Sequence, residues 1–171
     1  LYRTNAQSRV MEEAMLKNNI PYKVVGSFYF FNLREIKDLI SYLRLIYNIH
    51  DDVSLIRIIN SPKRGIGDKT IANLVTKAND NNTSLFEAIE SGKELAFKDL
   101  ILQLRQEADK LSLTELVEIV LEQSGLKAEL VNEKTVESEA RLENLEEFKS
   151  ITKSYEEKYG IIEMMKINNI L

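Results

Sequence analysis

The chain has 171 residues and a formal net charge of -4, with 44% hydrophobic and 29% charged residues. These are globular values, so wholesale disorder is excluded, and the length fits one domain or one domain plus part of another. The absence of Cys and the single His50 exclude a disulfide framework, a thiolate metal site and a multi-histidine metal centre. No apolar run approaches the roughly 18–20 residues that span a membrane.

The first 30 residues have a different pattern from the rest. Residues 1–4 are typical of the end of a strand, residues 6–18 of an amphipathic helix, and residues 22–25 of a second short strand. A strand-helix-strand unit needs a larger sheet beside it, and no further strands are predicted. Residues 1–30 are therefore predicted to be one edge of an α/β domain. The first residue is Leu1 rather than Met, which also suggests a fragment.

Residues 31–171 predict a mainly α fold, one compact multi-helix domain. Residues 34–47 carry the clearest pattern, with apolar residues three and four positions apart along one helix face. The expected helices, in chain order, are residues 34–47, 53–59, 68–78, 84–89, 95–110, 113–123, 135–159 and 161–167. Thr83 or Ser84 lies near the start of the helix at 84–89, and Ser112 or Leu113 near the start of the helix at 113–123, as candidate caps.

The segment from Leu55 to Ile71 predicts two helices joined by a tight hairpin centred on Gly65-Ile66-Gly67. Glycine at both positions allows positive φ, so a β-branched residue at Gly67 is expected to be penalised, and Ile66 is expected to fill the space between the helices. The second helix begins directly after Gly67. Its free N–H groups and positive dipole end can therefore bind a phosphate, to which Thr70 adds a hydroxyl.

The same segment is locally basic. Between Arg57 and Lys77 there are five basic residues and one acidic residue, a local charge of about +4 in a chain of -4. Lys63, Arg64 and Lys69 flank the turn and are expected to meet phosphates. This pattern is typical of a helix-hairpin-helix phosphate clamp, and its alternative is a plain helix-turn-helix corner with solvated lysines.

Three other features favour structural interpretations. The aromatic run at residues 28–31 is expected to pack at a domain junction rather than to stack on bases. His50 is expected to lie in a solvated loop. The carboxylates of residues 112–150 are interleaved with cations, so a solvated helix face is favoured over a paired-carboxylate hydrolase.

Five blocks together resemble the superfamily 1 DNA helicases of the UvrD, PcrA and Rep type. They are Leu-Tyr-Arg-Thr-Asn-Ala-Gln-Ser-Arg at residues 1–9, Tyr-Lys-Val-Val-Gly at 22–26 leading to Phe30-Phe31, Glu-Ile-Lys-Asp at 35–38, Pro-Lys-Arg-Gly-Ile-Gly-Asp-Lys-Thr at 62–70 and Ala-Arg-Leu-Glu-Asn-Leu-Glu-Glu-Phe at 140–148. The resemblance covers nearly the whole chain. It implies that residues 31–171 are the helical insertion subdomain called 2B and that residues 1–30 are the edge of the RecA-like subdomain 2A.

The resemblance also implies the activity of a longer parent protein. Such helicases use ATP and Mg²⁺ to unwind DNA in the 3′-to-5′ direction during repair or replication, in the bacterial cytoplasm near the nucleoid. This chain lacks the Gly-xxxx-Gly-Lys-[Ser/Thr] and Asp-Glu-xx-Asp motifs, so it is expected to hold no cofactor and to catalyse nothing alone. The implied partners are duplex DNA, the 3′ single strand, the rest of the helicase chain and repair or transcription proteins, with no membrane.

The resemblance assigns roles residue by residue. Gly65, Ile66, Gly67 and Thr70 match the family's duplex-contacting hairpin, and Lys37 matches another duplex contact. Arg3 and Asn5 match positions that touch single-stranded DNA. Leu33 stands where many members carry Arg or Lys, which puts one contact in doubt.

Two other functions stay open at this stage. One is a protein-interaction module that receives a repair or replication partner and binds DNA only weakly. The other is a free-standing helix-hairpin-helix DNA-binding protein, which the orphaned strands of residues 1–30 disfavour.

Overall fold

The computed structural model describes residues 27–164, and within this range every regular element is a helix. The predicted mainly α fold is confirmed for these residues. The expected strand-helix-strand unit lies outside them, because only Ser27–Phe30 of the first 30 residues is described, as the short helix α2. Of the expected helix at 161–167, residues 165–167 also lie outside.

The helices are, in chain order, α2 (Ser27–Phe30), α3 (Arg34–Tyr47), α4 (Asp52–Ile58), α5 (Asp68–Asn81), α6 (Leu85–Ala88), α7 (Lys93–Ala108), α8 (Leu113–Gln123), α9 (Leu126–Glu133) and α10 (Val136–Met164). The bounds of α3 and α8 agree with the sequence prediction. Two expectations were wrong. Helix α9 was not foreseen, and α10 continues through residues 161–164, where a separate helix was expected.

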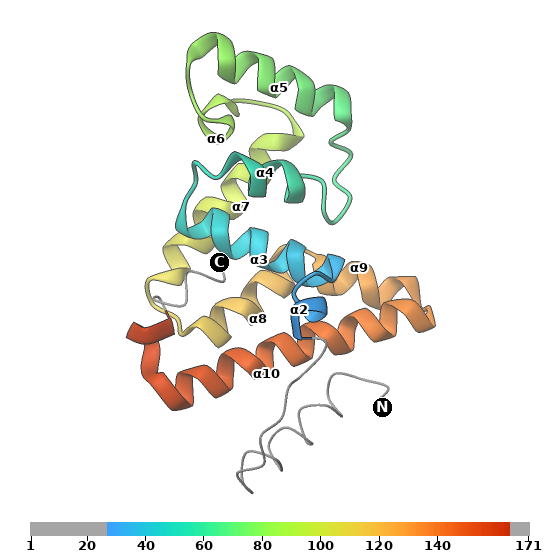
Figure 1. Ribbon diagram of the computed structural model, residues 1–171. Helices are drawn as coiled ribbons and strands as arrows, with labels where there is room; N and C mark the ends of the chain where they lie inside the picture. The colour runs from blue at the N-terminus through green and yellow to red at the C-terminus, as the bar shows by residue number, and fades with distance from the viewer. Residues whose placement is uncertain (1–26, 165–171) are drawn as a thin grey trace, which may run out of the picture.

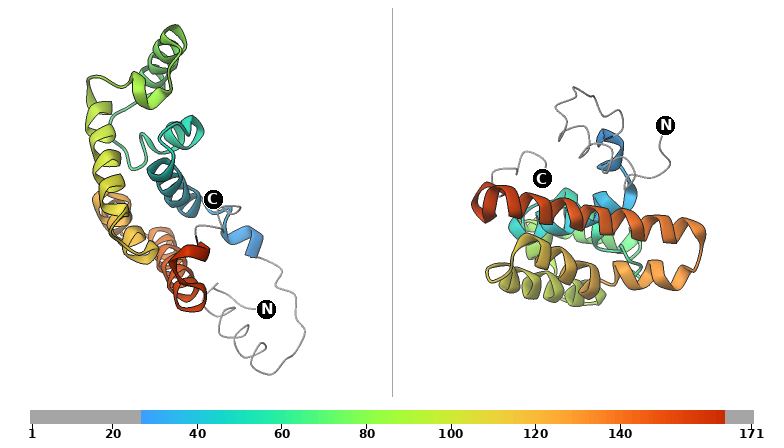
Figure 2. Two further views of the ribbon diagram at one scale, coloured as in Figure 1. Left: turned by 90° about the vertical axis from the view of Figure 1, so that its left-hand side faces the viewer. Right: turned by 90° about the horizontal axis from the view of Figure 1, so that it is seen from below.

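Helix α3 lies at the centre of the arrangement and packs against α4, α7, α8 and α10 (Figure 1). Helices α5 and α6 lie at one end of the molecule, and α8, α9 and α10 lie together at the other. The described helices follow an elongated, curved course rather than forming the compact ball expected from the sequence (Figure 2). The turn between α4 and α5 therefore lies on a scaffold built around α3.

The core explains why α3 is predictable from the sequence. Its stripe of apolar residues is fully enclosed, since Ile36, Leu39 and Leu43 have no exposed surface. Tyr42 is also fully buried and lies edge-on to Phe97 of α7. Burial of this stripe, at roughly 25 cal/mol per Å² of apolar surface, holds α3 against its neighbours.

The predicted caps of α6 and α8 are confirmed. Ser84 accepts a hydrogen bond from the Glu87 N–H, and Ser112 accepts one from the Glu115 N–H. In both cases the serine N–H in turn donates to the carboxylate of the glutamate, which completes a capping box.

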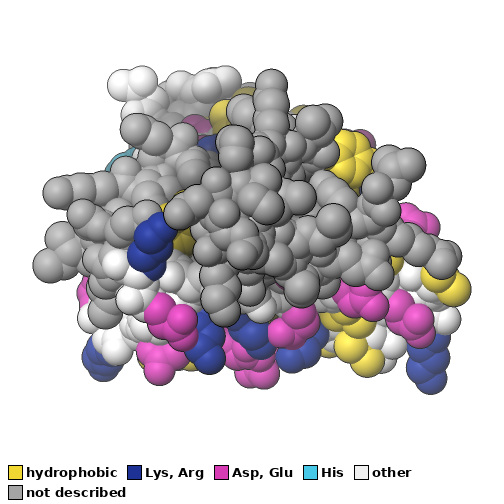
Figure 3. Space-filling model, turned by 60° about the horizontal axis from the view of Figure 1, so that its bottom comes forward, with side chains coloured by type: hydrophobic (Ala, Val, Ile, Leu, Met, Phe, Trp, Pro, Cys, Tyr) yellow, Lys and Arg dark blue, Asp and Glu magenta, His cyan; other side chains and the backbone are white. Residues whose placement is uncertain are grey.

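The minor sequence expectations have mixed outcomes. Phe30 is buried and meets Phe31 edge-on, so packing is confirmed for these two rings, whereas Tyr29 is 73% exposed. His50 is exposed in the α3–α4 loop, as predicted. Within residues 112–150, Glu118 pairs with Lys127 and Lys149, and Glu137 pairs with Arg141, consistent with the solvated helix face. Acidic and basic side chains also lie side by side along the lower edge of the view in Figure 3.

Candidate nucleic-acid interface

The connection between α4 and α5, residues 59–67, is longer than the tight hairpin expected from the sequence. Helix α6 packs against both α4 and α5, so the two helices do not form a simple helix-hairpin-helix corner. The connection runs away from α4 toward α8 and α9 and then returns to the start of α5 (Figure 1). Its shape is therefore set by contacts with distant parts of the chain.

The two glycines of the turn have different roles. Gly65 has a φ of +71°, in the left-handed region, and a Cβ placed on it would lie 2.6 Å from the Lys93 Nζ. Gly67 has a φ of -89° and a ψ of 174°, and a Cβ there would meet no atom within 4 Å. The expected positive φ at Gly67 is thus wrong, and only Gly65 is required by backbone conformation.

Ile66 lies between the glycines and is 1% exposed, so the predicted packing of this side chain is confirmed. Its N–H donates to the Asn60 Oδ1 at 3.2 Å, and the Arg64 N–H donates to the same oxygen at 2.7 Å. A single amide side chain therefore fixes the backbone on both sides of Gly65.

The Arg64 side chain points into the molecule. Its Nη1 donates to the carbonyls of Ile58 and Pro62, each at 3.2 Å, and reaches that of Ile59 at 3.5 Å. Its Nη2 donates to the Tyr42 Oη at 2.7 Å and the Ser124 carbonyl at 2.9 Å, and the guanidinium lies 5.3 Å from the centre of the Phe97 ring. Because these acceptors occupy the guanidinium, the geometry does not favour the phosphate contact expected of Arg64.

The start of α5 offers unpaired donors. Gly67 occupies the cap position and has no side chain with which to cap the helix. The first main-chain bond of the helix runs from the Ile71 N–H to the Gly67 carbonyl at 3.1 Å. Among the described residues, the N–H groups of Asp68, Lys69 and Thr70 meet no acceptor, so an anion could take that place.

The accessible charge near the turn is smaller than the sequence total. Arg57 pairs with Asp38 at 2.8 Å, and Lys77 pairs with Glu90 at 2.5 Å. Lys63 and Lys69 are exposed, and neither forms an ion pair with any residue that the structure describes. The local charge of about +4 is therefore reduced by the two carboxylates that reach in from α3 and from the end of α6.

Sequence reasoning missed Lys93, which begins α7. Its exposed side chain lies over Gly65, and across residues 27–164 it has no carboxylate partner. The Gly92-Lys93 pair carries no motif, so only the folded structure reveals this neighbour of the turn.

Lys37 lies on the first turns of α3 and is half-buried. The adjacent Asp38 holds Arg57 and accepts a hydrogen bond from the Ser61 Oγ at 2.9 Å, which ties α3 to the connection. The other predicted contacts, Arg3 and Asn5, lie outside the described residues.

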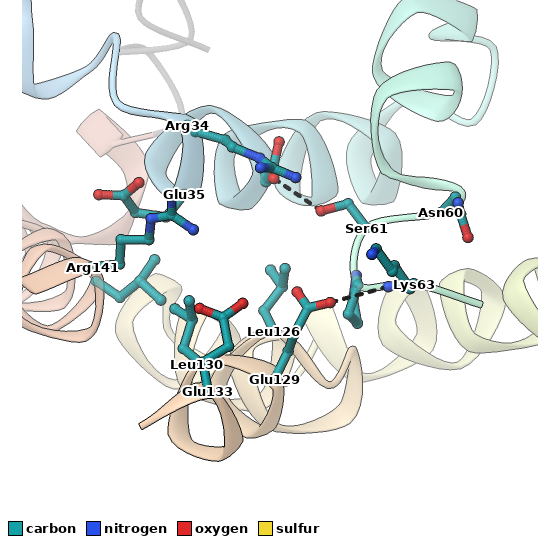
Figure 4. Close-up of a pocket in the computed structure, with 13 residues that line it drawn as sticks. Arg34, Glu35, Asn60, Ser61, Lys63, Leu126, Glu129, Leu130, Glu133 and Arg141 are labelled. Carbon is teal, nitrogen blue, oxygen red and sulfur yellow. Dashed lines mark hydrogen bonds between the residues drawn. The ribbon is translucent and has the colours of Figure 1, made fainter. Parts of the chain in front are cut away.

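A cavity of about 200 Å³ lies behind the connection, between α3, α9 and α10 (Figure 4). Leu126 and Leu130 of α9 line it together with Glu129 and Glu133, while Arg34 faces it from α3. The Glu129 Oε1 accepts the Lys63 N–H at 3.3 Å, which closes one wall. Four carboxylates and three cations line the cavity, so it has no excess of positive charge for a phosphate, and no group of described residues could hold a metal ion.

The sequence profile of one family, the UvrD-like helicase C-terminal domain, matches residues 1–171. The chain belongs to this family. It is 46% identical to the ATP-dependent DNA helicase PcrA of Staphylococcus epidermidis strain RP62A, over 98% of this chain and 25% of that protein. The corresponding protein of Staphylococcus aureus strain Mu50 is 45% identical, over 98% of this chain and 24% of that protein.

This member of the UvrD-like helicase family thus spans about a quarter of the length of these relatives. The sequence has no phosphate-binding Gly-xxxx-Gly-Lys-[Ser/Thr] loop. In addition, no helix in the described part of the chain is long and apolar enough to cross a membrane.

Proposed function

We propose that this chain is the duplex-contacting and regulatory subdomain 2B, with an edge of subdomain 2A, of a PcrA-type ATP-dependent 3′-to-5′ DNA helicase. The observation that carries the proposal is the uncapped start of α5, which presents free N–H groups beside the exposed Lys63 and Lys69. Such donors bind phosphate oxygens and read no bases, so the contact is independent of sequence.

Within this proposal, the contacts divide by chemistry. The N–H groups at the start of α5 and the Thr70 hydroxyl donate to one phosphate, while Lys63, Lys69 and Lys37 supply charge. The Ile66 N–H is bound to Asn60, so Ile66 stabilises the turn and does not donate to the phosphate. Gly67 contributes by lacking a side chain: a Ser or Asp there would occupy the N–H groups that the phosphate needs. For Arg3 and Asn5, contact with single-stranded DNA rests on the family resemblance alone.

The activity of the whole protein extends this proposal. The ATP-dependent helicase named in the relatives would hydrolyse ATP with Mg²⁺ in parts of the protein that this chain does not span, while this subdomain contacts the duplex ahead of the fork. Its partners would be DNA, the rest of the helicase chain and repair or transcription proteins in the bacterial cytoplasm. The 171-residue chain alone is expected to hydrolyse no ATP.

Titration of a fluorescent DNA duplex at several salt concentrations tests the proposal. The expected dissociation constant is roughly 10⁻⁴–10⁻⁶ M at physiological salt, with log K falling against log salt at a slope of about -3 for three lysines. Thr70→Ala removes one hydroxyl contact and is expected to cost about 0.5–1.5 kcal/mol of binding. Lys69→Met is expected to reduce the slope by about 0.9.

Thr76→Ala is the matched control, because Thr76 lies further along α5 with its hydroxyl bound to the Ala72 carbonyl. It should leave binding unchanged. If duplex affinity is also unchanged by Thr70→Ala and Lys69→Met, the turn is a structural corner. The chain would then be better explained as a protein-interaction module that recruits repair or replication partners.

A further inference from the structure

The connection between α4 and α5 is seated on the corner between α8 and α9. Arg64 donates to the Ser124 carbonyl at 2.9 Å, and the Lys63 N–H donates to Glu129 of α9. Between these contacts, a Cβ on Gly125 would lie 3.3 Å from the Pro62 Cγ, so the Pro62 ring packs closely on the Gly125 backbone. The turn is thus attached to helices that lie far from it in sequence.

Tyr42 completes the attachment from the opposite side. Its hydroxyl donates to the Ser61 carbonyl at 2.6 Å and accepts from the Arg64 Nη2 at 2.7 Å, while its side chain is fully buried. Burial raises the pKa of Tyr42 to about 12, so the hydroxyl keeps its proton at physiological pH. A side chain with no exposed surface cannot itself touch DNA.

We propose that Arg64 is a positioning residue, which holds the phosphate-contacting turn against Tyr42 and the α8–α9 corner and does not itself contact DNA. The proposal rests on the proposed function of the turn. It differs from the charge-based expectation, in which Arg64 and the adjacent Lys63 act alike. Five acceptors in fixed directions suit the planar fork of Arg, and a Lys ammonium with three donors cannot reach them all.

The neighbouring Lys63 provides the matched comparison, because it is exposed and carries the same charge. Arg64→Lys keeps the charge and loses the guanidinium group, and Arg64→Met loses both. Lys63→Met loses one charge and leaves the hydrogen bonds of Arg64 in place. Tyr42→Phe removes the buried hydroxyl and changes no charge. The four variants of the full chain therefore separate positioning from direct contact.

In salt titrations with the fluorescent duplex, Arg64→Lys and Arg64→Met should both weaken binding by about tenfold, with the wild-type salt slope. Tyr42→Phe should weaken it by about threefold, also with an unchanged slope. Lys63→Met should instead reduce the slope by about 0.9. If Arg64→Lys binds like wild type, or Arg64→Met reduces the slope as Lys63→Met does, Arg64 is a direct contact and the proposal is overturned.

Amide hydrogen exchange supplies a readout that needs no DNA. In Arg64→Lys and Tyr42→Phe, the N–H groups of Arg64 and Ile66 should exchange faster, while those in the middle of α10 keep their wild-type rates. Unchanged exchange at Arg64 and Ile66 would overturn the proposal even if DNA binds. Conversely, these two N–H groups could exchange faster in the variants while the wild-type chain binds no duplex. That result would support the positioning role of Arg64 and reject the DNA-contacting function.

Discussion

The cations of the α8–α10 contact and those of the α4–α5 connection have different partners. Between α8 and α10, the Lys149 Nζ lies 2.5 Å from a carboxylate oxygen of Glu118 and 2.9 Å from one of Glu146, and Lys127 also reaches Glu118. In the α4–α5 connection, Arg64 meets only neutral oxygens. Carboxylates thus neutralise the lysines between α8 and α10, whereas in the connection Lys63 and Arg64 form no ion pair with a described residue.

This difference shows why the net charge of -4 is a poor guide to what this protein can bind. Ionic screening limits the reach of a surface charge to about 8–10 Å, so a phosphate at the start of α5 would respond to charges within that distance and not to the net charge of the chain. Near the turn, the exposed Lys63 and Lys69, which form no ion pair with a described residue, supply the positive charge that a phosphate would meet.

The largest expected effect comes from removing the Arg64 guanidinium, which joins the turn to its neighbours. Arg64→Met leaves several inward-facing carbonyls without a donor, and it should lower the free energy of unfolding by about 2–4 kcal/mol. Urea denaturation followed by circular dichroism measures this change. The adjacent Lys63→Met should stay within about 0.5 kcal/mol of wild type. Equal effects of the two variants would contradict the distinction between them.

A smaller effect separates the two glycines. Gly65→Ser forces a side chain into the left-handed region and displaces Lys93, so it should destabilise the fold by about 1–2 kcal/mol. Gly67→Ser places a capping hydroxyl at the start of α5 and should stabilise it by a few tenths of a kcal/mol. Urea denaturation measures both.

Gly67→Ser should also change DNA binding. Because the new hydroxyl at Gly67→Ser competes for the N–H groups at the start of α5, duplex binding should weaken although the fold gains stability. Stronger or unchanged binding by this variant would argue against the phosphate site.

The smallest effect is expected at the paired end, as a dependence on pH. The hydrogen bond from Lys149 lowers the pKa of Glu118 below its ordinary value. Stability from this pair is therefore complete above the ordinary glutamate pKa and is lost as the pH falls through the lowered one. For a partly exposed pair the amount is at most about 1 kcal/mol.

Denaturation midpoints measured between neutral pH and pH 3 check this dependence. Lys149→Met should flatten the acid-side loss relative to wild type, since the largest cause of the lowered Glu118 pKa is then removed. An identical acid profile in the two proteins would show that the pair contributes nothing to stability.

Local patterns predicted the parts of the fold that are stabilised locally. The apolar stripe of α3 and a serine near the start of α8 were both predicted, because each depends on residues within a few positions. Helix α9 was missed because only Leu126 and Leu130 are buried in it, too few to form a recognisable period.

The candidate site was predicted less well, for a physical reason. The segment and its glycines were identified, but the acceptors of Arg64 include the main-chain carbonyls of Pro62 and Ser124, and any residue type supplies such carbonyls. No sequence pattern marks them.

The missing side chain at Gly125 has a consequence for how this surface could change. Because the Pro62 ring packs directly on the Gly125 backbone, we expect the turn to move together with the α8–α9 corner. A shift in the course of α8 or α9 would re-aim the start of α5 without altering any residue of the turn. The orientation of the surface proposed to contact DNA would then follow the positions of α8 and α9.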